Sequence, residues 1–349
     1  MSGGADRQRL IEAVILGGVA VLAMLIALTL VLTASSSAPG LDRRGPVLPD
    51  LAGTTSEVRT LAVETRAARF ELERDGEGWA LAGRAGFPAN ADLAERILTS
   101  LAELEYAGAR TASRNQHAAL GLVAPDQGGD GIRITAHDYD GRLVADLILG
   151  AARGESGSYL RRPDEDQTWA VIGLPPVATE ADRWMELDFL ALGTDTIARV
   201  QVQPESGPTY RLERPGLSVR NFALRSPPGW RPVTDGAGNG TGSVLSRVRF
   251  RDVRRADFTD PPVARHTAET FGGLRVEIAV YADGQSRWAT LRAVALSDDA
   301  QAEALALNNT ADNWAFLLSD LTISRLIRPL DDFAIRPAPP APQPDAEPR

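Results

Sequence analysis

The sequence predicts an α+β fold, in which an N-terminal transmembrane helix precedes two similar units of antiparallel sheet with packed helices. Three observations lead to this prediction. Residues 13–33 begin with a run of uncharged residues long enough to cross a bilayer as a helix. Alternating apolar and polar runs recur in the segments 58–192 and 193–335, in the same order relative to turns and tryptophans. An amphipathic stretch at helical spacing follows the first of these runs.

The N-terminal segment comes first. Residues 1–12 carry Arg7 and Arg9, and we expect this short tail to stay in the cytoplasm while the following body is exported. The apolar run at 13–33 is longer than the core of a cleavable signal peptide, so an uncleaved signal anchor is expected. Cleavage after the small residues that follow it is the alternative.

Two further segments are predicted to lack a fold of their own. Residues 34–57 are rich in Ser, Pro and Gly, which is typical of a flexible linker. Residues 336–349 form a proline-rich tail with too little apolar surface to fold, so we expect this end of the chain to be disordered.

The first predicted unit (58–192) opens with strands at 58–64 and 68–74. A helix follows, with Asn90 as its N-cap. Its apolar stripe consists of Leu93, Ile97, Leu101 and Leu104. A hairpin at 130–150 then turns at Asp140-Gly141, and a segment around Trp169 closes the unit.

The second predicted unit (193–335) repeats this order. Strands at 197–203 and 209–214 precede a helix that Ser243 is expected to cap. A hairpin at 272–296 turns at Asp283-Gly284, and a segment around Trp314 closes the unit. Because order, turn chemistry and tryptophans agree, an internal repeat is predicted, with the tryptophans as core anchors.

The composition excludes several reaction classes. The 349 residues include no cysteine and no lysine, so all 37 cationic side chains are arginine. Thiolate nucleophiles, disulfides, lysine Schiff bases and Walker A loops are therefore excluded. The net charge of −9 argues against nucleic-acid binding. The arginines at 247–251 and 254–255 are expected to form a solvated or ion-paired face.

Few residues suggest chemistry. The three histidines, His117, His137 and His266, fall in different segments without metal-ligand spacing. Four short motifs partly match a nucleophile elbow, a calcium loop, a cation site and a phosphate loop, and each is better explained as a turn, an exposed loop or a connector. They are Gly154-Glu155-Ser156-Gly157-Ser158, His137-Asp138-Tyr139-Asp140-Gly141, Asp164-Glu165-Asp166 and the glycine-rich stretch 235–242. No catalytic, cofactor-binding or metal-binding residue is predicted.

One series of motifs resembles a known family. Trp79 is followed by FPANADLAERILTSLAEL, then by Leu120-Gly121-Leu122, LILG, GSYLRR and Trp169. This order is similar to that of the DUF4340 family, a bacterial family of uncharacterised function, and the resemblance covers residues 58–333. The resemblance implies an anchored auxiliary component near an ABC transporter, since the family is often associated with gliding-motility-type ABC transport systems. Together with the apolar segment at 13–33, it leads us to expect a location in the bacterial inner membrane with the bulk of the chain in the periplasm. It implies no catalytic residues.

The predicted function is that of a non-enzymatic, membrane-anchored extracytoplasmic scaffold or interaction protein, with ABC transporter subunits as partners and no cofactor. The alternative is a tethered module that binds a cell-envelope glycan, which would need several exposed tryptophans on one face. A third hypothesis, an envelope hydrolase, would need carboxylates converging in a deep cleft.

Overall fold

The computed structural model describes residues 43–336 apart from residues 77, 154–156 and 175. The predicted cytoplasmic tail (1–12) and transmembrane helix (13–33) lie outside these residues, as do residues 34–42 of the linker and 337–349 of the tail. Among the helices in the described ranges, none combines the length and the apolar character that a membrane crossing requires.

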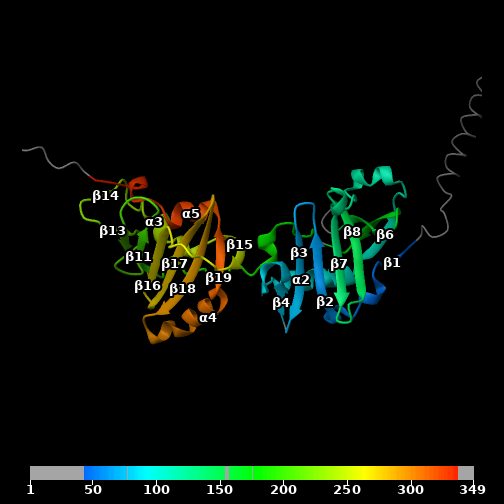
Figure 1. Ribbon diagram of the computed structural model, residues 1–349, viewed down its shortest axis with the longest axis horizontal. Coiled ribbons are helices and arrows are strands. Elements are labelled where there is room, and N and C mark those ends of the chain that lie inside the picture. Colours follow the sequence, from blue (N-terminus) through cyan, green and yellow to red (C-terminus); the bar gives the residue numbers. More distant parts are fainter. Residues whose placement is uncertain (1–42, 77, 154–156, 175, 337–349) are drawn as a thin grey trace, which may run out of the picture. The chain divides into compact units, whose positions relative to one another are not determined.

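The described chain is mostly antiparallel sheet with few helices, so the predicted α+β class is wrong. Two large sheets contain ten and eight strands, and two short strands form a third (Figure 1). The ten strands are β1 (Gly45–Pro46), β2 (Val58–Glu64), β3 (Arg69–Asp75), β4 (Gly78–Leu81), β5 (Phe87–Pro88), β6 (Glu105–Ala109), β7 (Ile132–Asp138), β8 (Leu143–Arg153), β9 (Gly157–Arg161) and β10 (Thr168–Ile172). The eight are β11 (Ile197–Gln203), β12 (Tyr210–Glu213), β13 (Ala223–Ser226), β15 (Phe250–Arg255), β16 (Ala264–Thr270), β17 (Leu274–Asp283), β18 (Ser286–Ala295) and β19 (Trp314–Leu318). The short pair is β14 (Arg231–Pro232) with β20 (Ala334–Ile335).

Helices are short and few in the described chain. They are α2 (Ala91–Ala102), α3 (Asn239–Gly242), α4 (Gln301–Ala311) and α5 (Asp320–Leu326). The predicted cap of α2 is confirmed, because the Asn90 Oδ1 accepts a hydrogen bond from the Leu93 N–H at 3.0 Å. Of the predicted stripe, Ile97, Leu101 and Leu104 are buried and Leu93 is half-buried.

The prediction of a second helix capped by Ser243 is wrong. Residues 239–246 form the four-residue α3 and a 3-10 turn, and the Ser243 hydroxyl donates back to the Asn239 carbonyl at 2.7 Å. From Arg247 onward the sequence alternates between charged and apolar side chains, and a period of two favours a strand. The chain accordingly enters β15, in which Phe250 and Val253 are buried.

The same strand order occurs in both large sheets. Eight strands of the larger sheet follow the order β6-β10-β9-β8-β7-β2-β3-β4, and the smaller sheet follows β15-β19-β18-β17-β16-β11-β12-β13. The two series match strand by strand, since β2 takes the place of β11, β3 that of β12, and so on along the chain. The two halves of the sequence therefore use one strand topology.

The two predicted hairpin turns form as expected but are not equivalent in this topology. Asp140-Gly141 joins β7 to β8, with Gly141 at a φ of +77°, and Asp283-Gly284 joins β17 to β18, with Gly284 at +56°. The strands equivalent to β7 and β8 are β16 and β17, which are joined through residues 271–273. An Asp-Gly turn indicates only that the two strands beside it form a hairpin. The match of the two turns therefore could not show which strands of the two halves are equivalent.

The described chain divides into two compact units. Of the described residues, unit 1 comprises those within 43–55, 98–134 and 144–176, and unit 2 those within 56–97, 135–143 and 177–336. The predicted boundaries at 58–192 and 193–335 stay a prediction. Each unit is described below by itself.

The core of unit 1 lies around β10. Trp169 is 2% exposed, and the ring of Tyr106 meets it edge-on at 4.9 Å between centroids. Residues 45–51, which fall in the predicted linker, add β1 to β6 and bury Val47, Leu48 and Leu51. These three apolar side chains explain why this part of the segment is ordered: their burial offsets the conformational entropy of the short chain.

The core of unit 2 is rich in aromatic rings. Phe316 on β19 packs against Phe250 at 4.8 Å and against Phe189 at 5.0 Å between ring centroids. Near β12, Tyr210 meets Phe333 edge-on at 5.3 Å, and its hydroxyl donates to the Arg328 carbonyl at 2.7 Å. Desolvation raises the pKa of the Tyr210 hydroxyl, which therefore stays a protonated donor.

Candidate functional site

The residues that carry the family resemblance form a loop packed onto a strand in unit 1. The Leu120-Gly121-Leu122 turn lies against β8 at Gly150, the last residue of the LILG motif. A Cβ at Gly150 would lie 2.2 Å from the Leu120 carbonyl oxygen and 2.9 Å from the Leu122 Cγ. Gly121 itself adopts a φ of +67°. The motif is therefore a close backbone approach that only glycine permits.

A buried arginine holds this loop in place. Arg161 is the first of the two arginines in the GSYLRR motif and is 5% exposed. Its Nε donates to the Leu122 carbonyl at 2.8 Å, and its Nη1 donates to the carbonyls of Arg162 and Pro163 at 3.1 and 3.0 Å. Burial lowers the pKa of this guanidinium from its ordinary value. Its donors are directed at backbone carbonyls, which is a structural use of the charge.

The histidines also have structural partners. The Nε2 of His117 donates to the Asp166 carbonyl at 2.9 Å, and the Nδ1 of His266 donates to the Leu326 carbonyl at 2.8 Å. His137, on β7, pairs through Nδ1 with the Thr60 hydroxyl at 3.3 Å. In the part of the chain that the structure describes, no three His, Asp or Glu side chains gather as metal ligands.

The acidic motifs close turns and ion pairs. The Asp138 carboxylate accepts hydrogen bonds from the N–H groups of Arg142 and Asp140 and from the Arg142 guanidinium, at 2.9 to 3.0 Å. The backbone bond from Arg142 is the largest cause that lowers the pKa of Asp138. In the second acidic run, Asp166 accepts from Arg114 at 2.6 Å and Glu165 lies 3.7 Å from Arg43. In the calcium-loop motif, the Asp138 carboxylate is thus used to close the hairpin turn.

The glycine-rich stretch 235–242, which leads into and includes α3, is a packing element. Cβ atoms at Gly238 and Gly242 would meet the side chains of Leu212 and Phe222 at 3.0 and 2.5 Å. The Asn239 Oδ1 accepts from the Phe222 N–H at 2.9 Å and so closes the loop. The absence of a side chain at Gly238 and Gly242 thus allows Leu212 and Phe222 to pack against the backbone. Of the stretch 154–158, which is expected to be a loop and not a nucleophile elbow, residues 154–156 lie outside the described residues. The Ser158 hydroxyl donates to the Gly150 carbonyl at 3.2 Å.

Four of the six tryptophans are buried, namely Trp79, Trp169, Trp184 and Trp314. Trp230 and Trp288 are half-buried. The guanidinium of Arg254 lies 4.2 Å from the ring centroid of Trp288 and therefore covers one of its faces. The core-anchor prediction is confirmed for the buried four. The glycan alternative required free rings on one face, and these environments give it no support.

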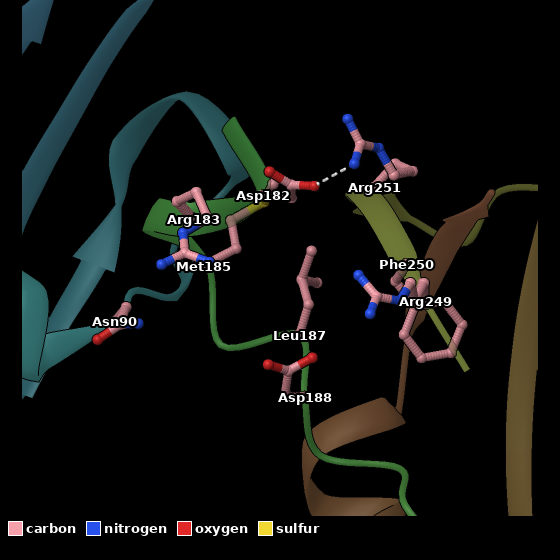
Figure 2. A pocket seen from close by; sticks show the side chains of 9 residues that line it. All are labelled: Asn90, Asp182, Arg183, Met185, Leu187, Asp188, Arg249, Phe250 and Arg251. Atoms are coloured by element: carbon pink, nitrogen blue, oxygen red, sulfur yellow. Dashed lines mark ion pairs between the residues drawn. The ribbon is translucent and has the colours of Figure 1, made fainter. Parts of the chain in front are cut away.

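A pocket that sequence reasoning did not find lies in unit 2 (Figure 2). Its volume is about 230 Å³. The lining combines charged and amide side chains with three apolar ones: Asn90, Asp182, Arg183, Met185, Leu187, Asp188, Arg249, Phe250 and Arg251. The one sequence signal for it is the alternation of arginines at 247, 249 and 251, of which the last two line the pocket and which by itself predicts only a solvated or ion-paired face.

The backbone around this pocket is fixed by buried partners. Arg183 precedes Trp184, which is fully buried, and whose carbonyl accepts from the Asn90 N–H at 3.0 Å. The N–H of Arg249 donates to the Thr322 hydroxyl at 3.1 Å, and its carbonyl accepts from the Ser319 N–H at 3.2 Å. The backbone that carries Arg183 and Arg249 in the pocket lining is therefore held by hydrogen bonds and buried neighbours.

The comparisons with known proteins agree with the motifs. The model of a family described as a domain of unknown function, DUF4340, matches residues 79–265. Comparison with curated proteins and with solved structures gave no match. The matched segment contains all the motifs from Trp79 to Trp169, including the loop that Arg161 holds on β8. Since it spans more than half of the sequence, this chain belongs to the DUF4340 family.

Proposed function

We propose that this protein is a non-enzymatic, membrane-anchored interaction protein with an extracytoplasmic body, an auxiliary component of an ABC-type transport system. The proposal rests on the structural role of the residues that form the family motifs. Leu120, Gly121, Leu122, Gly150 and Arg161 build a loop packed on a strand, through close approach and hydrogen bonds to carbonyls. These contacts are structural, and they support a role in interaction in preference to catalysis.

The exposed face of the smaller sheet also supports a role in recognition. Arg199 on β11 pairs with Glu213 at 3.2 Å and with Glu269 at 2.6 Å, and Arg275 pairs with Glu269 at 2.7 Å. Fixed charges of this kind contribute little to stability when exposed, but they discriminate between partners.

The membrane location rests on the sequence. The apolar segment at 13–33 is the proposed signal anchor, with the short N-terminal tail in the cytoplasm of a bacterial cell and the bulk of the chain in the periplasm.

In-cell crosslinking tests this function. The tagged full-length protein is crosslinked, purified in mild detergent and analysed by mass spectrometry. Permease or ATPase subunits of one transporter are expected to co-purify, and to be missing from a control strain that carries an unrelated single-span protein with the same tag. Recovery of the protein alone in gentle detergent, or only with envelope polymer, contradicts the proposal.

A further inference from the structure

The pocket in Figure 2 contains three arginines, although the chain as a whole carries a net charge of −9. Arg183, Arg249 and Arg251 are all exposed. They face two carboxylates, Asp182 and Asp188, so the pocket carries a net positive charge. A cationic pocket on an acidic protein attracts anions selectively.

Among the described residues, only Arg251 of these three arginines has a neutralising partner. Arg251 lies 2.7 Å from the Asp182 carboxylate. For the guanidinium groups of Arg183 and Arg249, the described residues provide no ion pair. Figure 2 shows these two side chains on either side of Leu187. Their donors are thus available to a ligand that enters between them.

We propose that this pocket binds a carboxylate side chain from a short acidic segment of a partner protein, with Arg183 and Arg249 as the groups that hold it. This inference rests on the proposed function, because it assumes a protein partner, and it names the chemistry that this partner presents.

The lining favours a carboxylate over a phosphate. Arginine pairs with a carboxylate through two parallel hydrogen bonds. Asp182 and Asp188 repel a phosphate dianion more strongly than a single carboxylate. Met185, Leu187 and Phe250 supply an apolar wall against which the methylene groups of a glutamate can pack.

The backbone that carries the two arginines is also preorganised for binding. The neighbouring residue Trp184 is fully buried, and the backbone of Arg249 is bonded on both sides to Ser319 and Thr322. A ligand therefore orders the arginine side chains alone and not the backbone that carries them, which reduces the entropic cost of binding.

The test is calorimetric titration of the full-length protein in detergent. The probes are a terminally blocked Gly-Glu peptide repeat, the matching Gly-Gln repeat, and inorganic phosphate. The Glu peptide is expected to bind, more weakly as salt is raised, and the Gln peptide is expected not to bind. Each of Arg183→Gln and Arg249→Gln is expected to weaken binding about tenfold or more, because a charge-assisted hydrogen bond contributes at least that much.

The matched control is Arg220→Gln, which removes an exposed arginine outside the pocket lining and should leave the affinity unchanged. Equal binding by the pocket variants and the wild type, tighter binding of phosphate than of the Glu peptide, or no binding of the Glu peptide overturns the inference. Crosslinking of the Arg183→Gln/Arg249→Gln variant separates the two proposals. A transporter captured as efficiently as by the wild type leaves the proposed function standing and removes the pocket from it.

Discussion

The side-chain amide of Asn308 pairs with the backbone of Ala293 in the way that a neighbouring strand would. Its Oδ1 accepts from the Ala293 N–H at 2.8 Å, and its Nδ2 donates to the Ala293 carbonyl at 2.8 Å. β19 pairs with β18 only at Trp288 and Ala289, so the later part of β18 would otherwise present an open edge. Helix α4 covers this part of the strand through Asn308.

Asn308→Ala is therefore expected to lower the free energy of unfolding by about 1–3 kcal/mol, because two backbone groups lose their partners at once. Denaturant unfolding measures the change. Asn309→Ala is the matched control, since Asn309 is the next residue in α4 and is exposed. Equal stability of the two variants would show that water replaces the Asn308 amide.

Gly150→Ala is expected to destabilise the protein by about 3 kcal/mol, the upper end of the range for overpacking. The new methyl group would lie 2.2 Å from the Leu120 carbonyl oxygen, and that atom belongs to backbone that cannot simply rotate away. The melting temperature and the free energy of unfolding report the effect.

Gly216→Ala provides the control for this substitution. A Cβ at Gly216 meets nothing within 4 Å, and its backbone does not adopt a positive φ. The free energy of unfolding should stay the same or rise slightly, because alanine has fewer unfolded conformations. A Gly150→Ala protein as stable as Gly216→Ala would contradict the packing account of the LILG motif.

Arg161→Met should cost about 2–4 kcal/mol of stability, since it leaves the carbonyls of Leu122, Arg162 and Pro163 without their charged donor. Arg161→Lys should recover only part of this loss, because one ammonium lacks the planar fork of donors. Arg110→Met, at an exposed arginine of the same unit, is the control and should change the stability by less than about 0.5 kcal/mol. Limited proteolysis at residues 111–131 would show whether the loop itself is released.

Strands with alternating apolar and polar residues are predictable from the sequence, whereas helices held by tertiary contacts are not. Strands such as 58–64 and 197–203 were predicted at their observed bounds, because alternation reports directly on a half-buried strand. Helix α4 gave no such signal. Leu305 is 62% exposed while Leu307 is 8% exposed, so its apolar side chains do not form one stripe. Tertiary contacts, including that of Asn308, specify this helix.

The candidate pocket was beyond sequence reasoning for a different reason. Asn90, Arg183 and Arg249 are distant in the sequence, and only the tertiary structure brings them to one lining. The glycines and arginine of the family motifs were visible in the sequence, but their roles were not. A glycine that admits a carbonyl oxygen and an arginine that binds three carbonyls depend on backbone placement that no local pattern encodes.

His266 offers a test through pH. The ring is fully buried on β16, and its Nδ1 donates to the Leu326 carbonyl at 2.8 Å, while its Nε2 has no partner among the described residues. Desolvation is the main cause that lowers the pKa of His266 to about 4, and the hydrogen bond to Leu326 opposes it.

The unfolded chain, with a histidine pKa near 6.5, therefore binds a proton more readily than the folded protein between about pH 6.5 and pH 4. Stability is expected to fall by up to about 3 kcal/mol as the pH is lowered through this window, and to be unaffected by this residue above it. His266→Asn keeps a donor for the Leu326 carbonyl but cannot be protonated. Unfolding of both proteins measured from pH 8 to pH 4 should give a steeper loss for the wild type. Parallel curves would mean that His266 titrates normally in the folded protein, and so that the ring is reached by water.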